Sequence, residues 1–263
     1  MTFHGERPGT VFGWPLAIDL RSTKGQKDRP LLERGTRLEA FPVERGRGEP
    51  LAESSDHIAD LLEAALEELG FRDRGLRDRL TSLVELVFAW SARINLTGHR
   101  DRESIARGLV LDALGLTSLI PDEPNLVDLG SGAGFPGLPI ALARPGCRIT
   151  LVESRAKRHH FQRAAIRELA IENAEARLGR AEILEPTLHR VAVARAVGRL
   201  EDVIPWMVRW LEPGGLLLVP IRAGSRPPDP VGAVSLCIRS YRAPLGGPER
   251  QVWVGSKDAT PRL

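Results

Sequence analysis

The stretch from Asn125 to Pro139 constrains this chain more than any other, because a short apolar run leads directly into closely spaced glycines. The run Leu126 to Leu129 is apolar apart from Asp128, and the glycines that follow are Gly130, Gly132, Gly134 and Gly137. Glycine adopts positive-φ conformations and lets a ligand approach main-chain N–H groups that a Cβ would shield. With the apolar segment that comes next, the pattern predicts a strand, a tight turn and a helix that hold a polar cofactor.

The glycines can be read in two frames, which imply different cofactors. Gly132, Gly134 and Gly137 spell G-x-G-x-x-G, and Glu153 lies about twenty residues on, as in dinucleotide-binding enzymes that use nicotinamide or flavin. The other frame begins at Asp128 and reads D-x-G-x-G-x-G, the loop of class I methyltransferases that use S-adenosylmethionine. We favour the second frame, because its first glycine follows the strand at once and the acid lies inside it.

Longer strings around this loop resemble one known family. The strings are VDLGSGAGFPGLPIALARPG, LVESRAKRHHFQRA, GRAE at Gly179 to Glu182 and ARAV at Ala194 to Val197. They are similar to the bacterial small-subunit rRNA guanine-N7 methyltransferases (RsmG, also called glucose-inhibited division protein B). Asn95-Leu96-Thr97, with Trp90 ahead of it, fits the same family. The resemblance spans roughly Ala65 to Gly224, and its G-F-P-G ending is far more specific than a generic methyltransferase loop.

The resemblance implies a fold, a reaction and a set of cofactor-binding residues. The fold is α/β, a Rossmann-like doubly wound sheet with an antiparallel last strand, preceded by a small helical subdomain. The reaction transfers a methyl group from S-adenosylmethionine to nitrogen 7 of a guanine in 16S rRNA. The implied cofactor-binding residues are Asp128, Gly130, Gly132, Gly134, Phe135, Glu153, Ala181, Glu182 and Arg195.

Each implied residue has an expected place around the cofactor. The three glycines would pass close to its methionine part, with Asp128 orienting the loop and Phe135 in contact. Glu153 would accept hydrogen bonds from the ribose hydroxyls. Ala181 and Glu182 would border the adenine, and Arg195 would meet the cofactor carboxylate or an RNA phosphate.

The residues near these motifs also bear on the methyl acceptor. Carbon-5 methylation of pyrimidines uses a cysteine nucleophile, yet neither Cys147 nor Cys237 stands where such a group would follow a strand. Methylation of an adenine amine usually goes with an Asn/Asp-Pro-Pro-aromatic loop, whereas this chain has ARAV there. Nitrogen 7 of guanine carries a lone pair and no proton, so its methylation needs alignment rather than a general base. We therefore expect no catalytic acid or base.

Two segments depart from the family pattern. The family typically has R-H-x-x-D upstream, whereas Arg107 to Asp112 lacks the histidine and is one residue longer. The Leu-Lys-Gly expected after the fifth strand is also missing, since this chain has Val219-Pro220-Ile221-Arg222. Three alternatives therefore stay open: a paralogue with a different acceptor, a nicotinamide-dependent oxidoreductase, and a non-catalytic RNA-binding protein.

The rest of the chain divides into three expected parts. Residues 1–55 are rich in proline, glycine and mixed charge without periodicity, which predicts a flexible extension. Residues 56–120 carry helical apolar stripes, with helices expected from Ser55, from about Leu76 and from Ile105 to Leu119. In residues 121–263 strand and helix patterns alternate, which predicts a mostly parallel sheet that ends in a terminal hairpin.

Composition adds expectations about compartment and partners. No apolar run approaches a membrane span and no signal pattern opens the chain, so a cytoplasmic protein is expected. The two cysteines have no metal-site spacing, and we expect them reduced and buried, with no metal bound. We expect 16S rRNA or the small ribosomal subunit as partner and a monomeric protein. Basic residues could contact RNA phosphates, or could simply form a solvated helix face: Arg144, Arg148, Arg155, Lys157, Arg158, Arg163 and Arg167, with His159 and His160 among them.

Overall fold

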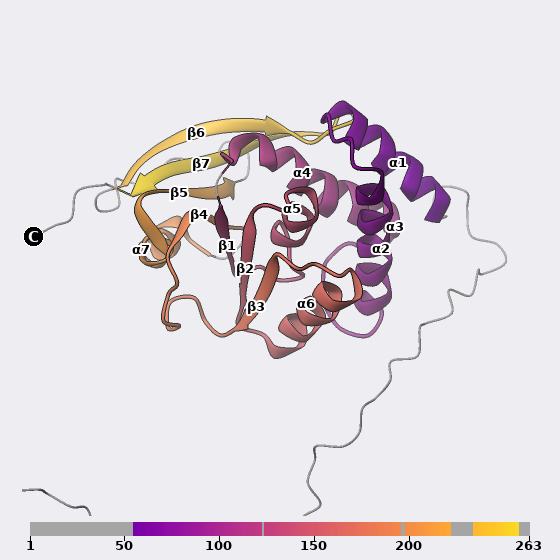
Figure 1. Ribbon diagram of the computed structural model, residues 1–263. Coiled ribbons are helices and arrows are strands. Elements are labelled where there is room, and N and C mark those ends of the chain that lie inside the picture. Colours follow the sequence, from indigo (N-terminus) through magenta and orange to yellow (C-terminus); the bar gives the residue numbers. More distant parts are fainter. Residues whose placement is uncertain (1–54, 123, 196–197, 222–233, 258–263) are drawn as a thin grey trace, which may run out of the picture. The chain divides into compact units, whose positions relative to one another are not determined.

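Seven strands form a single sheet in the order β3-β2-β1-β4-β5-β7-β6 in the computed structural model, which describes residues 55–122, 124–195, 198–221 and 234–257 (Figure 1). Strands β1 to β5 pair in parallel, and β7 runs antiparallel to both β5 and β6. The strands are β1 (Asn125–Leu129), β2 (Arg148–Glu153), β3 (Ala174–Leu178), β4 (His189–Ala194), β5 (Leu211–Ile221), β6 (Val234–Arg242) and β7 (Glu249–Lys257). This order confirms the expected doubly wound sheet with an antiparallel last strand.

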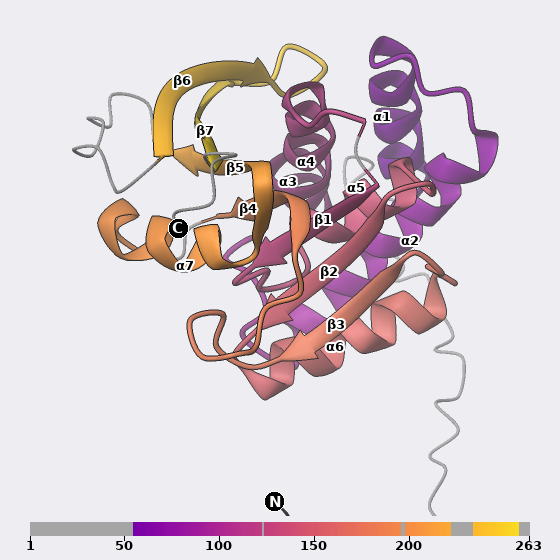
Figure 2. The same ribbon diagram turned by 60° about the vertical axis from the view of Figure 1, so that its left-hand side comes forward.

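Helices cover both faces of the sheet, because successive residues of a strand point to opposite sides. Leu126 and Leu151 pack into a cluster with residues of α2, α5 and α6, whereas Val127 and Leu129 pack into another with residues of α7. Figure 2 shows strands of the sheet between α7 and the group of α2, α5 and α6. Both faces of the sheet are therefore covered by helices, as is usual for parallel strands. The helices are α1 (Ser55–Glu68), α2 (Arg74–Ser91), α3 (Arg102–Ile105), η2 (Ala106–Leu111), α4 (Asp112–Leu116), η3 (Thr117–Leu119), α5 (Gly137–Ala143), α6 (Ala156–Glu168) and α7 (Leu200–Arg209).

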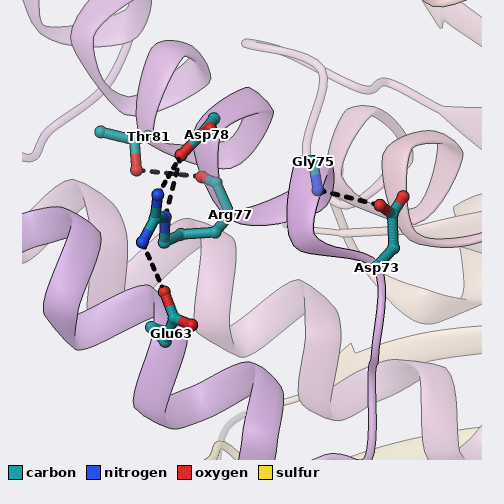
Figure 3. A network of polar contacts seen from close by, with 6 residues as sticks. All are labelled: Glu63, Asp73, Gly75, Arg77, Asp78 and Thr81. Atoms are coloured by element: carbon teal, nitrogen blue, oxygen red, sulfur yellow. Dashed lines mark hydrogen bonds and ion pairs between the residues drawn. The ribbon is translucent and has the colours of Figure 1, made fainter.

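Helices α1 and α2 form a pair of amphipathic helices whose apolar stripes match the sequence prediction. Ile58, Leu62, Leu80 and Leu83 are fully buried and belong to the same hydrophobic cluster as the sheet residues. Asp73 caps α2 by accepting a hydrogen bond from the Gly75 N–H at 2.9 Å, and Arg77 reaches from α2 to Glu63 of α1 at 2.6 Å (Figure 3). Because the Arg77 ion pair is exposed, the buried leucines contribute most of the stabilisation.

The helix expected from Ile105 to Leu119 is instead divided into four short segments. Its second segment, η2, is a π-helical stretch, in which hydrogen bonds join residues five apart in the chain, against four apart in an α-helix. The wider turn can accommodate one additional residue, so the apolar side of the following helix, α4, still faces the core. The segment with the additional residue, Arg107 to Asp112, overlaps this stretch.

The structure also bears on the expectations for the two cysteines and for the ends of the chain. Cys147 is buried, but Cys237 is exposed because it lies on the edge strand β6, so the expectation that both cysteines are buried is wrong for Cys237. The flexible extension expected over residues 1–55 lies outside the described residues, apart from Ser55. Ala196, Val197 and Arg222 lie outside them as well. No helix among the described residues is long and apolar enough to cross a membrane.

Candidate active site

The glycine loop joins β1 to α5 and follows the predicted pattern. Gly130, Gly132 and Gly134 have φ values of 71°, 58° and 81°, a region that residues with a Cβ rarely adopt. The loop turns inward through hydrogen bonds from the N–H groups of Gly134 and Phe135 to the Ser131 carbonyl, at 2.8 and 3.0 Å. Each of these three positions therefore favours glycine, because its backbone conformation is one that residues with a Cβ rarely adopt.

Asp128 lies under this loop with no exposed surface. Its Oδ2 accepts the N–H of Gly137, the first residue of α5, at 2.9 Å, while its Oδ1 is buried and has no hydrogen-bond partner among the described residues. Burial raises the pKa of Asp128 to about 7, against the opposing effects of the Gly137 N–H and the Arg195 charge. A buried acceptor atom without a partner is costly, so it marks a position where a ligand can donate a hydrogen bond.

Neighbouring elements hold the loop in place. The N–H groups of Gly130 and Ser131 both donate to the Val152 carbonyl of β2, at 2.9 and 3.0 Å. Gln162, a fully buried residue of α6, donates from Nε2 to the Ser131 hydroxyl and to the Gly132 carbonyl, each at 2.8 Å. The loop is therefore fixed by β2 and α6 before any ligand binds, which lowers the entropy lost on binding.

Glu153 ends β2 and is 4% exposed, beside the glycine loop. Its Oε2 accepts the Gly132 N–H at 2.9 Å, and its Oε1 accepts the Arg155 N–H at 2.7 Å. Oε1 also accepts the Ser154 hydroxyl at 3.4 Å. A carboxylate oxygen has two lone pairs, so Oε2 is the oxygen that can accept a further hydrogen bond. The structure thus brings Glu153 to the loop, with remaining capacity for a hydroxyl donor.

The end of β3 lies next to Glu153. The Gly179 N–H donates to the Glu153 carbonyl at 2.9 Å, and Ala181 follows as a buried residue. The Ala181 carbonyl accepts a hydrogen bond from the Trp210 indole at 3.0 Å, which ties this turn to the end of α7. The Glu182 side chain is exposed and pairs with Arg180 at 2.7 Å, so its carboxylate points away from the buried turn.

Arg195 directly follows β4, and its partner comes from a helix far away in the sequence. Its Nη1 lies 2.7 Å from Oδ2 of Asp112 at the start of α4. The other Asp112 oxygen, Oδ1, accepts hydrogen bonds from the Tyr241 hydroxyl at 3.0 Å and from Nε of Arg250 at 3.2 Å. Asp112 therefore connects the carboxyl end of β4 to the terminal hairpin of β6 and β7.

Comparison with known proteins identifies the family. The family model for rRNA small subunit methyltransferase G matches residues 77–225, more than half of the chain. The chain belongs to this family. The match includes the glycine loop, Glu153, the Ala181 turn and Arg195.

Two relatives carry the same name, Ribosomal RNA small subunit methyltransferase G. The one from Stenotrophomonas maltophilia (strain R551-3) is 37% identical over 162 residues, which covers 61% of this chain and 76% of the relative. The one from Neisseria gonorrhoeae (strain NCCP11945) is 36% identical over 139 residues, which covers 53% and 67%. Among solved structures, M. jannaschii TYW2 in complex with AdoMet has a TM-score of 0.46 at 13% identity, over 57% of this chain and 75% of that one.

Membership in the rRNA small subunit methyltransferase G family decides between the two glycine frames. The enzyme is an S-adenosylmethionine-dependent rRNA methyltransferase, and the nicotinamide alternative is wrong. In the structure, the three glycines of the D-x-G-x-G-x-G frame all have positive φ, and Gly137 is the first residue of α5 and donates to Asp128. A Cβ on Gly137 would overlap the Leu151 side chain, so this glycine serves close packing.

Sequence reasoning missed two supports of this methyltransferase site and considered Arg158 only as a possible RNA contact. Gln162 supports the loop, and Asp112 holds Arg195. Arg158 of α6 lies against the loop, with Nη1 3.8 Å from the position of a Cβ on Gly132, and its buried Nε has no hydrogen-bond partner among the described residues. Phe135, by contrast, is 6% exposed and packs within the core cluster.

The basic residues of the methyltransferase do not form one surface. Arg144 donates to the carbonyls of Thr117, Ile120 and Pro121, so it stabilises the chain before β1. Arg148 starts β2 and lines a hollow of about 360 Å³ at the amino ends of the strands, opposite the glycine loop. Apart from Arg158, which lies against the glycine loop, the basic residues of α6 and the adjacent Arg155 stay a predicted RNA contact. The described residues contain no cluster of potential metal ligands.

Proposed function

We propose that this enzyme methylates nitrogen 7 of a guanine in the RNA of the small ribosomal subunit. The acceptor in this proposal is taken from the family resemblance. The methyl-donor site rests on one observation above the others, the pair of unpartnered polar atoms that flank the glycine loop. Asp128 contributes a buried carboxylate oxygen and Arg158 a buried guanidinium nitrogen. The amino acid end of S-adenosylmethionine carries an ammonium and a carboxylate group, which are the complementary charges.

The remaining site residues fit the other parts of the cofactor. Glu153 Oε2 has a free lone pair for a ribose hydroxyl, and the buried turn at Ala181 lies beside Glu153 for the adenine. Bound at the loop, S-adenosylmethionine supplies an electrophilic methyl group on a sulfonium centre. Gly132 keeps the loop open to the ligand, because nothing but Arg158 and a loop carbonyl comes within 4 Å of where its Cβ would be.

Nitrogen 7 of guanine suits a site of this kind. Its lone pair attacks without losing a proton, so the protein has to align the reacting atoms and does not need a general base. Arg195, which Asp112 holds in place, directly follows β4 at the edge of the sheet where the glycine loop lies. In an RNA helix nitrogen 7 lies in the deep, narrow groove that protein groups cannot enter, so the acceptor is expected in a loop or single-stranded region.

The partner and the assembly follow from the family and from the site. We propose small-subunit rRNA, free or within the ribosomal subunit, as the substrate and the cytoplasm as the compartment. We propose that the enzyme acts as a monomer, which is supported by the donor loop, Glu153, Arg158 and Arg195 all coming from one chain. A related enzyme with a different RNA acceptor is the outcome to be tested against this proposal.

An in vitro transfer assay tests the proposal. Purified enzyme and methyl-labelled S-adenosylmethionine are incubated separately with small ribosomal subunits, with their naked rRNA and with transfer RNA. Digestion to nucleosides followed by mass spectrometry then identifies the product. Labelled 7-methylguanosine from one of the first two substrates supports the proposal, whereas label in another nucleoside, or only in transfer RNA, refutes the proposed acceptor.

A further inference from the structure

His99 lies in the segment between α2 and α3, and hydrogen bonds stabilise the backbone on both sides of it in the chain. Its own N–H donates to the Thr97 hydroxyl at 3.3 Å, and Asp101 two residues later caps α3 by accepting the Ser104 N–H at 2.7 Å. The backbone around His99 is thus fixed by short local bonds. Its imidazole ring is half-buried.

The ring lies against the backbone of Gly108 in η2. A Cβ at position 108 would fall 2.9 Å from Nε2 and 3.1 Å from Nδ1 of His99, with Cε1 nearer still. Real Cβ atoms do not approach other atoms this closely, so any residue other than glycine at 108 would displace the ring. The neighbouring Gly98 has nothing within 4 Å of its Cβ position, so this restriction is specific to Gly108.

The electrostatic environment of the ring includes the Arg195–Asp112 pair, because Gly108 lies one turn before Asp112 in the chain. Burial lowers the pKa of His99 and the positive charge of Arg195 lowers it further, while Asp101 and Asp112 act in the opposite direction. The imidazole is therefore neutral at physiological pH, with one donor and one acceptor nitrogen. Neither nitrogen has a hydrogen-bond partner among the residues that the structure describes.

The location of Arg195 links this ring to the methyl donor site. Leu129 and Ala194 are register partners in β1 and β4, so Gly130 and Arg195 follow at the same edge of the sheet. The His99 ring lies against Gly108, and Asp112, one turn later in the chain, contacts Arg195 at 2.7 Å. The donor loop, Arg195 and the His99 ring therefore lie around one region.

We propose that His99, placed by the absence of a side chain at Gly108, contacts the base that receives the methyl group. This inference rests on the proposed rRNA methyltransferase function and adds the residue that orients the acceptor purine. A neutral imidazole can donate to one ring acceptor of a purine or accept from its amino group, and its flat face can stack on the base. Arg195 is paired with Asp112 through Nη1, and its other guanidinium nitrogens can still meet the phosphate or the cofactor.

Two substitutions test the proposal, one at His99 itself and one at the glycine against which its ring lies. His99→Ala removes the ring, and Gly108→Ala leaves the ring present but displaces it. Both are expected to lower kcat/KM for rRNA about tenfold, the effect of losing about one hydrogen bond. The dissociation constant of S-adenosylhomocysteine should remain within twofold of wild type for both. His99→Gln, which keeps a donor, should restore part of the activity.

The double variant and a control separate positioning from folding. If displacement of the ring explains the effect of Gly108→Ala, the variant with both His99→Ala and Gly108→Ala should be no less active than His99→Ala alone. Gly98→Ala, next to His99 but in open space, should behave as wild type. Wild-type rates in His99→Ala, with 7-methylguanosine still formed, would overturn this inference and leave the proposed function intact. Absence of rRNA methylation by the wild-type enzyme would instead overturn the proposed function.

Discussion

Arg195 and Asp112 are 83 residues apart in the chain, and their side chains meet at 2.7 Å. The Asp112 side chain is only 9% exposed and that of Arg195 25%, so water screens this pair little. Tyr241 and Arg250 donate to the other carboxylate oxygen. One carboxylate thus fixes an arginine at the carboxyl end of β4 and connects it to the terminal hairpin.

Replacing Asp112 by Asn should destabilise the protein. The neutral amide removes the charge that compensates Arg195 and Arg250, and breaking a buried pair from one side costs about 3 kcal/mol. Denaturant unfolding measures the loss. Glu249→Gln removes one partner of an exposed ion pair with Arg242 and should change the free energy of unfolding by less than about 0.5 kcal/mol. Equal effects from both substitutions would show that Asp112 does not anchor Arg195.

Asp128 should make cofactor binding depend on pH. Its pKa of about 7 means that the carboxylate needed by an ammonium group becomes protonated as the pH falls. Affinity for S-adenosylhomocysteine should fall about tenfold between about pH 8 and about pH 6, because only about a tenth of the carboxyls are ionised one unit below the pKa. Calorimetric titration of wild type and Asp128→Asn tests this. A pH-independent wild-type affinity, or an equal slope in the variant, would contradict it.

The same carboxyl has the opposite effect on the ligand-free protein. Its pKa rises from the ordinary value of 3.8 to about 7 on folding, so the folded state binds the proton more tightly than the unfolded chain. The free energy of unfolding should therefore fall as the pH rises from about 4 to about 7. The difference between wild type and Asp128→Asn in denaturant unfolding isolates this contribution. A difference that stays constant over this range would refute the raised pKa.

Gly132→Ala should separate backbone strain from ligand contact. Gly132 has a φ of 58° and lies in the cofactor loop, whereas Gly70 has a φ of 77° and lies in open space after α1. Alanine at either position should cost about 1 kcal/mol in the free energy of unfolding. Only Gly132→Ala should weaken binding of S-adenosylhomocysteine, by about tenfold or more, because its methyl group would project into the ligand's approach. Equal binding of S-adenosylhomocysteine by the two variants would show that the loop is not part of the cofactor site.

Arg158→Met should weaken cofactor binding with little effect on stability. The substitution keeps an unbranched chain but deletes the guanidinium whose Nε is buried without a partner beside the loop. Losing a charge-assisted hydrogen bond should raise the dissociation constant of S-adenosylhomocysteine about tenfold. Lys157→Met, in the exposed adjacent position, is the matched control and should bind as wild type. Unchanged binding by Arg158→Met would assign this arginine to another role.

The local parts of the site could be predicted from the sequence. The apolar run, the glycines and the acids at Asp128 and Glu153 act within one strand–turn–helix unit and the strand after it, so spacing alone indicates where they lie. The parallel sheet followed from alternating periodicities, because each element buries its own apolar side. The antiparallel hairpin followed from turn residues between the last two apolar runs.

The long-range parts could not be predicted in this way. The partner of Arg195 is Asp112, and no local pattern selects one carboxylate among many. The imidazole against Gly108 comes from His99, before α3, in a chain whose helix lacks the histidine of the family pattern. The π-helical stretch that absorbs an additional residue, and the exposure of Cys237 on an edge strand, depend on tertiary packing rather than on propensity.

The nucleoside composition of small-subunit rRNA tests the central claim most directly. Ribosomal RNA is purified from a strain that lacks this enzyme, from its parent and from the deletion strain carrying either the wild-type gene or the Gly132→Ala variant. Quantitative mass spectrometry should show 7-methylguanosine reduced in the deletion strain, restored by the wild-type gene and not restored by the variant. An unchanged content of 7-methylguanosine in the small-subunit rRNA of the deletion strain would contradict the account.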